Sequence, residues 1–172
     1  MKKGFTLIEM LIYIGILTII ILFTIYFVSW GIKMSAKSKA SQEVLENAKL
    51  AMEKIVFEIR GAKEIYTPTS VFDAHPGQLS LKTQQNLPEG ENATYADFYL
   101  ENEKIYLKRE SQNPQALTSE RVKVTNLVFR HLNSAFSTSS IQAELKIEYK
   151  TSSKKPEWQA QTFLISTATL RK

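Results

Sequence analysis

The stretch MKKGFTLIEMLIYIGILTIIILFTIYFVSWGI, residues 1–32, decides the architecture of this chain. Two lysines and a glycine follow the initial methionine, and between Phe5 and Ile32 the only charged residue is Glu9. The uncharged run 10–32 exceeds the roughly 20 residues that a helix needs to span a bilayer. We therefore predict a transmembrane helix over residues 5–32. A carboxylate at the centre of such a helix costs about 2.5–3.5 kcal/mol, so a lone Glu9 near its start calls for a partner.

Ordinary targeting signals do not account for this segment. A secretory signal peptide has an apolar region of roughly 7–15 residues and a small-residue cleavage site. Here the apolar run is longer, and no small-x-small site follows it before the polar region begins. A retained signal anchor explains the span, but it does not explain the Gly4-Phe5 junction or Glu9.

The residues Gly4-Phe5-Thr6-Leu7-Ile8-Glu9 resemble the class III signal and N-methylation motif of type IV pilins and type II secretion pseudopilins. In that family prepilin peptidase, a membrane aspartic peptidase, cuts after the glycine and methylates the new N-terminal phenylalanine. The resemblance implies a leader peptide at residues 1–4, cleavage between Gly4 and Phe5, and N-methylation of Phe5.

The resemblance also implies a role for Glu9 in filament assembly. Cleavage creates an ammonium group on Phe5, about one helical turn from Glu9. In a filament, the ammonium of one subunit pairs with Glu9 of its neighbour, and two charges that are costly alone offset each other. The alternative is a solvated Glu9 at the level of the lipid headgroups.

Size and composition suit a membrane-anchored subunit. The chain has 172 residues, enough for one globular domain and an anchor, and it has no cysteine for a disulfide, a metal knuckle or a thiol nucleophile. Loss of the leader removes two lysines and lowers the net charge from +5 to +3. No cofactor is expected.

The pilin-like leader implies a single pass through the inner (cytoplasmic) membrane, with a cytoplasmic N-terminus and an extracytoplasmic C-terminal domain. Three lysines that follow the span slightly favour the opposite orientation on a positive-inside count. Long domains translocate largely regardless of local charge, so we keep the topology that the leader implies.

The helical pattern continues past the membrane. Apolar residues recur at steps of three and four and predict an amphipathic helix over residues 33–66 that continues the span. A single helix of about 60 residues is roughly 90 Å long, and Gly61 or Pro68 is expected to end it. Glu58 falls outside the apolar stripe, which consists of Leu45, Ala48, Met52, Ile55, Ile59 and Ala62.

From about Thr67 the period changes to two, which predicts an antiparallel β-sheet domain over residues 67–172. Glu101-Asn102-Glu103 separates two alternating segments and predicts a hairpin. The whole is an α+β fold of pilin type, with a long N-terminal helix packed on an antiparallel sheet. The expected strands cover residues 79–81, 95–100, 104–109, 122–129, 141–149 and 158–170.

The later segments resemble minor rather than major subunits. Residues 51–62, AMEKIVFEIRGA, look like the helix end of J-type minor pseudopilins and W-type minor pilins. The stretches around Leu117-Thr118 and 122–129, and the closing 166–171, are also similar to that group.

Catalytic and metal-binding chemistry find little support. The two histidines, His75 and His131, have no convincing nucleophile or acid partner in local spacing, so the chain is predicted not to be an enzyme. Acidic loops that contain Asp73, Glu89 and Glu91 lack the carboxylate density that calcium requires, so no metal site is expected.

Nucleic-acid binding is a second possibility that we weigh. Basic residues lie along the predicted strands together with aromatics, but acidic residues are interspersed and alternating strands normally expose solvated charges on one face. The basic residues are Lys104, Lys108, Arg109, Arg121, Lys123 and Arg130.

The sequence therefore predicts a minor pilin or pseudopilin, a structural or initiating subunit of a type IV pilus-like or type II secretion filament. Its expected partners are prepilin peptidase, other pilin or pseudopilin subunits, the inner-membrane assembly platform and membrane lipid. The alternatives are a filament-associated module that binds DNA or a surface, and an unprocessed bitopic membrane-anchored protein.

Overall fold

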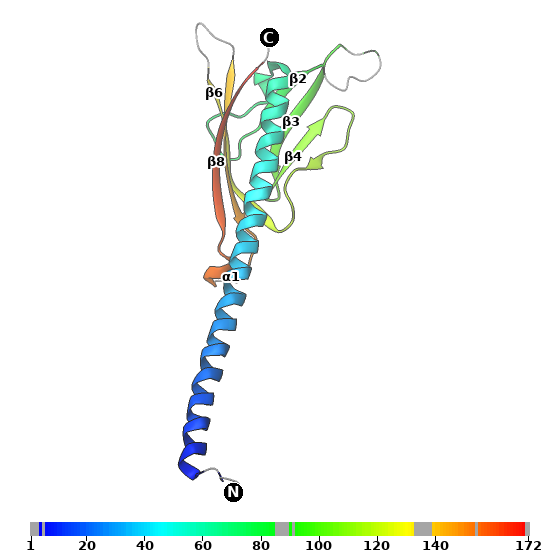
Figure 1. Ribbon diagram of the computed structural model, residues 1–172. Coiled ribbons are helices and arrows are strands. Elements are labelled where there is room, and N and C mark those ends of the chain that lie inside the picture. Colours follow the sequence, from blue (N-terminus) through cyan, green and yellow to red (C-terminus); the bar gives the residue numbers. More distant parts are fainter. Residues whose placement is uncertain are drawn as a thin grey trace.

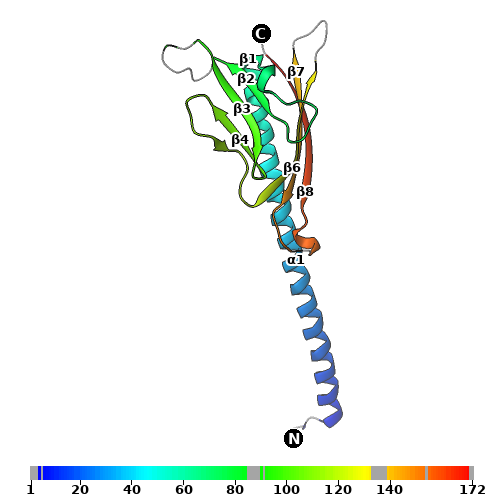
Figure 2. The ribbon, with the colours of Figure 1, turned by 180° about the vertical axis from the view of Figure 1, so that it is seen from behind.

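A long helix carries a β-sheet head at its C-terminal end (Figure 1). The computed structural model describes residues 4, 6–84, 90, 92–132, 139–153 and 155–170. The helix packs on antiparallel sheets, so the α+β class expected from the sequence is confirmed. Figure 2 shows from behind that the first half of the helix projects beyond the head, with the start of the helix at the far end.

Helix α1 runs from Leu7 to Gly61, 55 residues, which is about 80 Å at 1.5 Å per residue. It ends at Gly61, one of the two expected ends, so the predicted bound at residue 66 is five residues too late. At Ala62 the backbone becomes extended, with φ −75° and ψ 144°, and the Ala62 N–H donates to the carbonyl of Ile59. The next residues pair with a strand from the sheet, which satisfies their backbone groups better than a further helical turn would.

The second half of α1 buries one face. Its buried residues recur at steps of three and four, as the pattern predicts, but the face is rotated slightly from the expected one. Leu45 is 39% exposed and Val44 takes its place in the core. Glu58, expected on another face, is buried. The buried set is Ala40, Val44, Asn47, Ala48, Ala51, Met52, Ile55, Glu58 and Ile59.

Five strands form the first sheet, in the order β1-β2-β3-β4-β5, with each pair antiparallel. The predicted hairpin is confirmed: Glu101 pairs with Lys104 across a two-residue turn in which Asn102 and Glu103 have φ values of 50° and 64°. The strands are β1 (Ala62–Ile65), β2 (Leu79–Thr83), β3 (Thr94–Glu101), β4 (Lys104–Arg109) and β5 (Gln115–Ala116), and the short 3₁₀ helix η1 (Thr67–Thr69) lies between β1 and β2.

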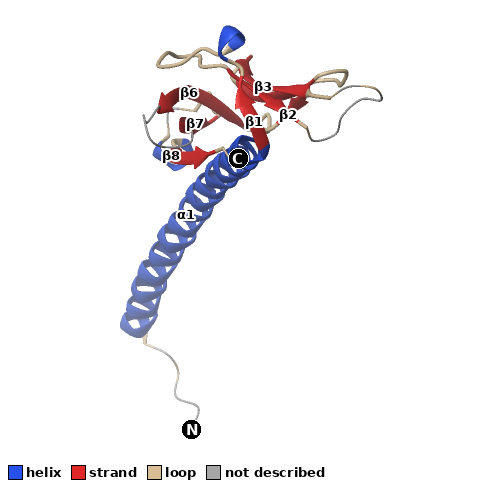
Figure 3. Cartoon of the chain, turned by 90° about the horizontal axis from the view of Figure 1, so that it is seen from above, coloured by secondary structure: helices blue, strands red, loops and turns tan. Residues whose placement is uncertain are grey.

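Three strands form a second sheet, β6 (Val122–Leu132), β7 (Ser140–Tyr149) and β8 (Gln161–Thr169), in that order. The last strand begins later than expected, because Pro156–Trp158 forms the 3₁₀ helix η2. The sequence suggested one sheet, whereas Figure 3 shows two groups of strands gathered at one end of α1. The segment between η1 and β2 bridges them, since the N–H groups of Asp73 and Gly77 donate to carbonyls of β6.

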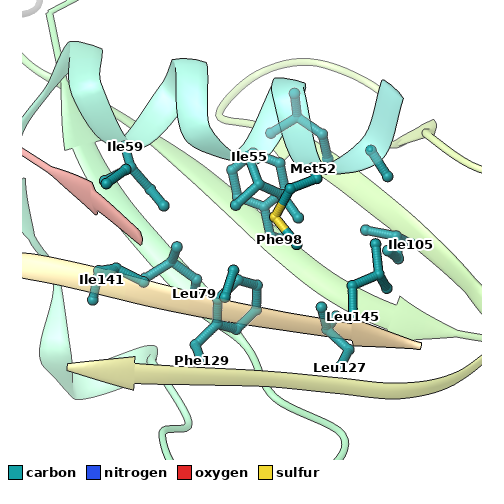
Figure 4. Close-up of a cluster of buried hydrophobic side chains, with 14 of the residues drawn as sticks. Met52, Ile55, Ile59, Leu79, Phe98, Ile105, Leu127, Phe129, Ile141 and Leu145 are labelled. Carbon is teal, nitrogen blue, oxygen red and sulfur yellow. The ribbon is translucent and has the colours of Figure 1, made fainter. Parts of the chain in front are cut away.

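The hydrophobic core lies between α1 and both sheets (Figure 4). Ile55 and Ile59 of the helix lie in one buried cluster with Phe98 of the five-stranded sheet and Phe129 of the three-stranded sheet. The helix packs mainly against β7 and β8 and also touches β2 and β6. The core therefore needs the helix and both sheets together.

Candidate processing and assembly site

The first turn of α1 is closed by a capping box. Thr6 is the N-cap residue, and its hydroxyl accepts the N–H of Glu9 at 3.3 Å. In return the Glu9 carboxylate accepts the Thr6 N–H at 2.8 Å and the Thr6 hydroxyl at 2.9 Å. The two residues satisfy backbone donors that would otherwise lack partners at a helix start. Glu9 therefore has a local partner in the isolated chain.

The capping role of Thr6 was not predicted from the sequence. The signal was present, because Thr-x-x-Glu before an apolar run is the sequence signature of a capping box. The box fixes the start of the helix at Leu7, so the segment before it is non-helical where the structure describes it.

Gly4 lies exposed just before this capped start, and a Cβ added to it would meet no atom within 4 Å. Phe5, the expected new N-terminus, lies outside the described residues, as do the residues before Gly4. The backbone at Gly4 is therefore open to approach.

The first half of α1 is apolar and wholly exposed. In the described part of the chain one helix, α1, is long and apolar enough to cross a membrane, with a mean hydropathy of 2.7 over its most apolar window and none of that window buried. The hydroxyls of Thr18 and Thr24 donate at 2.8 Å to the carbonyls of Ile14 and Ile20, four residues earlier. These polar groups therefore need no water, which suits a helix in lipid.

Both histidines have structural surroundings. Nδ1 of His75 accepts the N–H of Leu127 at 3.1 Å, which holds the bridging segment against β6. The His131 ring packs on Phe72 with 5.4 Å between ring centroids. Asp73 pairs with Arg130 at 3.6 Å. Among the described residues, no group of three or more His, Asp or Glu could hold a metal; Glu89 and Glu91 lie outside this set.

The basic residues that suggested a nucleic-acid groove do not form one surface. Arg109 points into the head and pairs with Glu58, whereas Lys104 pairs with Glu120 at 2.9 Å. Arg121, Lys123 and Arg130, on or beside β6, pair with Glu43, Glu148 and Glu144. Only Lys108 of the six makes no ion pair within the described residues. Paired cations divided between two sheets offer little to a phosphate backbone.

Two of these ion pairs favour the charged form of their carboxylates, those of Glu120 and Glu148. The hydrogen bond from Lys104 lowers the pKa of Glu120 below its usual value. Burial alone would raise the pKa of Glu148, but hydrogen bonds from Lys123 and Lys146 outweigh it and the pKa is lowered. Such groups act as ion pairs near neutral pH rather than as proton donors.

Comparison with known proteins adds one match. Residues 1–25 match the family model of the prokaryotic N-terminal methylation motif. No curated protein and no solved structure matches the chain significantly. The motif indicates a pilin or pseudopilin that prepilin peptidase processes and that assembles with other pilin subunits. Such proteins are structural, and the motif together with the apolar N-terminal helix fits a membrane-anchored protein.

Proposed function

We propose that the chain is a minor pilin or pseudopilin, a structural or initiating subunit of a type IV pilus-like or type II secretion filament. The observation that carries the proposal is a single helix with two different halves. The first half is apolar, is exposed on all sides and begins within the methylation motif, and the second half packs against the β-sheet head. The J-type or W-type assignment rests on the resemblance of residues 51–62.

In this proposal the leader is residues 1–4, and the peptidase cuts between Gly4 and Phe5 and methylates Phe5. The span is residues 5–32, in the inner membrane with the head outside the cytoplasm. The open backbone around Gly4 supports access of the peptidase. The inner-membrane assembly platform would then receive the processed subunit.

Glu9 is the proposed assembly residue. Phe5 is bonded to Thr6, so cleavage creates the ammonium one residue before the capping box that holds the Glu9 carboxylate. Each subunit thus carries a cation and an anion at the same end of its apolar helix. In a filament core, where water is excluded, the ammonium of one subunit pairs with Glu9 of the next.

The test compares four forms of the protein at equal membrane levels: the original, Gly4→Trp, Glu9→Leu and Thr6→Val. Intact-mass analysis reports processing, and crosslinking to the other subunits reports incorporation. We expect the original to begin at a methylated Phe5 and Gly4→Trp to keep its leader. A mature N-terminus at Phe5 in Gly4→Trp contradicts the role of Gly4 in processing. An intact leader in the original contradicts cleavage itself and favours an unprocessed anchor.

Glu9→Leu should be inserted and cleaved but excluded from the filament. Stranding one member of a buried ion pair costs about 3–5 kcal/mol, more than a hundredfold in an assembly equilibrium. Thr6→Val is the matched control, because it removes the capping hydroxyl and leaves the carboxylate and the Thr6 N–H in place. It should still assemble. Equal incorporation of Glu9→Leu and the original would remove the role of Glu9.

A further inference from the structure

The membrane-proximal end of the head forms a basic and aromatic surface. In Figures 1 and 2 the orange-red η2, at Pro156–Trp158, is the part of the head nearest the exposed half of α1, and it contacts that helix. Along α1, Ala36 is the first residue that is half-buried and Ala40 the first that is buried. The head therefore begins to cover the helix at Ala36.

This level coincides with the expected headgroup layer. The apolar run ends at Ile32, four residues or about 6 Å before Ala36. The polar layer of each leaflet is roughly 5–7 Å thick, from a hydrocarbon core of about 30 Å and a full bilayer of about 40–45 Å. If the span is inserted as in the proposed function, on which this inference rests, η2 lies among the lipid headgroups.

Along α1, the charges at this level are all positive. After Glu9 the next acidic residue along the helix is Glu43, and three lysines lie between them. Lys33 and Lys39 lie three residues on either side of Ala36, so each is about 60° around the helix from the covered face. Four lysines, Lys33, Lys37, Lys39 and Lys155, are exposed and have no ion pair within the described residues.

The loop that precedes η2 adds hydrogen-bond donors and an interfacial aromatic. Thr151 and Ser153 use their hydroxyl oxygens as acceptors for loop N–H groups, at 3.0 and 3.3 Å, so their hydrogens can be donated outward. They help to line a polar hollow of about 410 Å³, whose lining also includes Lys123 and Glu148, paired with each other at 3.2 Å. Trp158 stacks on Tyr149 with 5.9 Å between centroids, and both residue types favour the membrane interface. Glu157 is the one acidic residue in η2, and it is half-buried.

We propose that this basic collar, Lys33, Lys37, Lys39, Lys155 and Trp158, binds the headgroups of anionic phospholipids and holds the head against the membrane surface. Four unpaired cations at headgroup height complement an anionic lipid surface. The same surface offers little to a protein partner while the span is inserted, because the bilayer lies directly below it. The contact stabilises the subunit in the membrane, and extraction into a filament has to break it.

The test uses the full chain in nanodiscs of phosphatidylcholine alone or with increasing phosphatidylglycerol. Hydrogen exchange of the 151–160 segment and emission of Trp158 in a Trp30→Phe background report contact with the headgroups. We expect slower exchange and a blue shift as phosphatidylglycerol increases, and loss of both at 1 M salt. Each lysine that is neutralised should weaken the apparent affinity of the collar for phosphatidylglycerol about fivefold, which corresponds to about 1 kcal/mol per lysine.

The decisive variant is Lys37→Gln/Lys39→Gln/Lys155→Gln, which should lose the dependence on phosphatidylglycerol. Its matched control, Lys49→Gln/Lys63→Gln/Lys108→Gln, removes the same charge from exposed positions elsewhere and should keep it. If the protein inserts but hydrogen exchange and Trp158 emission are the same with and without phosphatidylglycerol, the lipid-binding role of the collar is wrong and the proposed function stands. Equal protection by soluble glycerol phosphate in neutral nanodiscs also overturns a lipid site. A chain that does not insert in either nanodisc contradicts the proposed function itself.

Discussion

At the scale of single residues, the most informative group in the head is Glu58. Its side chain is 2% exposed, and its Oε1 lies 2.5 Å from Nη2 of Arg109 and 2.8 Å from Nζ of Lys54. A buried carboxylate is tolerated only when it is paired. Arg109 ends β4, so this contact ties the five-stranded sheet to α1.

Arg109→Leu should destabilise the head by about 3 kcal/mol, the lower end of the range for a broken buried pair, because Lys54 still faces Glu58. Glu58→Leu/Arg109→Leu should recover most of this loss, since it leaves no buried charge unpaired. Lys54→Met, at a partly exposed position, should cost less than about 1 kcal/mol. Urea denaturation of residues 33–172 measures all three. A double variant as unstable as Arg109→Leu would disprove the coupling.

At the scale of the elements, α1 changes its surroundings along its length. Its first half has no buried residue, whereas its second half buries a face against β7 and β8. In a layered α+β head such a helix acts as one wall of the core. Two positions two residues apart show the difference between this face and the solvent face: Ile55 is fully buried, whereas Phe57 is 57% exposed.

Ile55→Ala should lower the free energy of unfolding by about 2–5 kcal/mol, because it leaves a cavity between the helix and both sheets. Phe57→Ala should cost less than about 1 kcal/mol, since the ring loses mainly an exposed contact with the Lys54 ammonium. Thermal unfolding of the two variants provides the comparison. Equal losses would mean that the helix face is assigned wrongly.

At the scale of the whole molecule, the head and the span are separable. The core residues begin at Val44, and residues 7–34 are exposed throughout. The described part of the span therefore contributes no buried residue to the core, whereas the second half of α1 supplies one of its walls.

Residues 33–172 should be soluble without detergent and should fold cooperatively, with helix and strand both visible in circular dichroism. Residues 62–172 are the matched control: they lack α1, so the apolar faces of both sheets lose their cover and the fragment should aggregate or stay unfolded. A disordered 33–172 fragment, or a stable 62–172 fragment, would contradict this account of the core.

The sequence by itself determined the features that depend on residues close together in the chain. The length of the apolar run and the two-residue period of the strands are local patterns, and each predicts its element directly. The Gly4-Phe5 junction and Glu9 are local patterns too, and the processing and assembly roles that they indicate stay predictions. The turn between Glu101 and Lys104 belongs to the same class, since hairpin partners are neighbours in sequence.

Only the tertiary structure decided which elements meet. Alternation shows that a strand has a buried face, but it does not say which strand lies beside it, so the division into two sheets was not predictable. Helix α1 ends at Gly61 because the following residues pair with Leu81 and its neighbours, which come later in the chain. The sequence placed Glu58 outside the apolar stripe, whereas in the fold it pairs with Arg109, which lies 51 residues later in the chain. These outcomes depend on contacts between residues far apart in the sequence, and the periodic pattern of apolar residues does not predict such contacts.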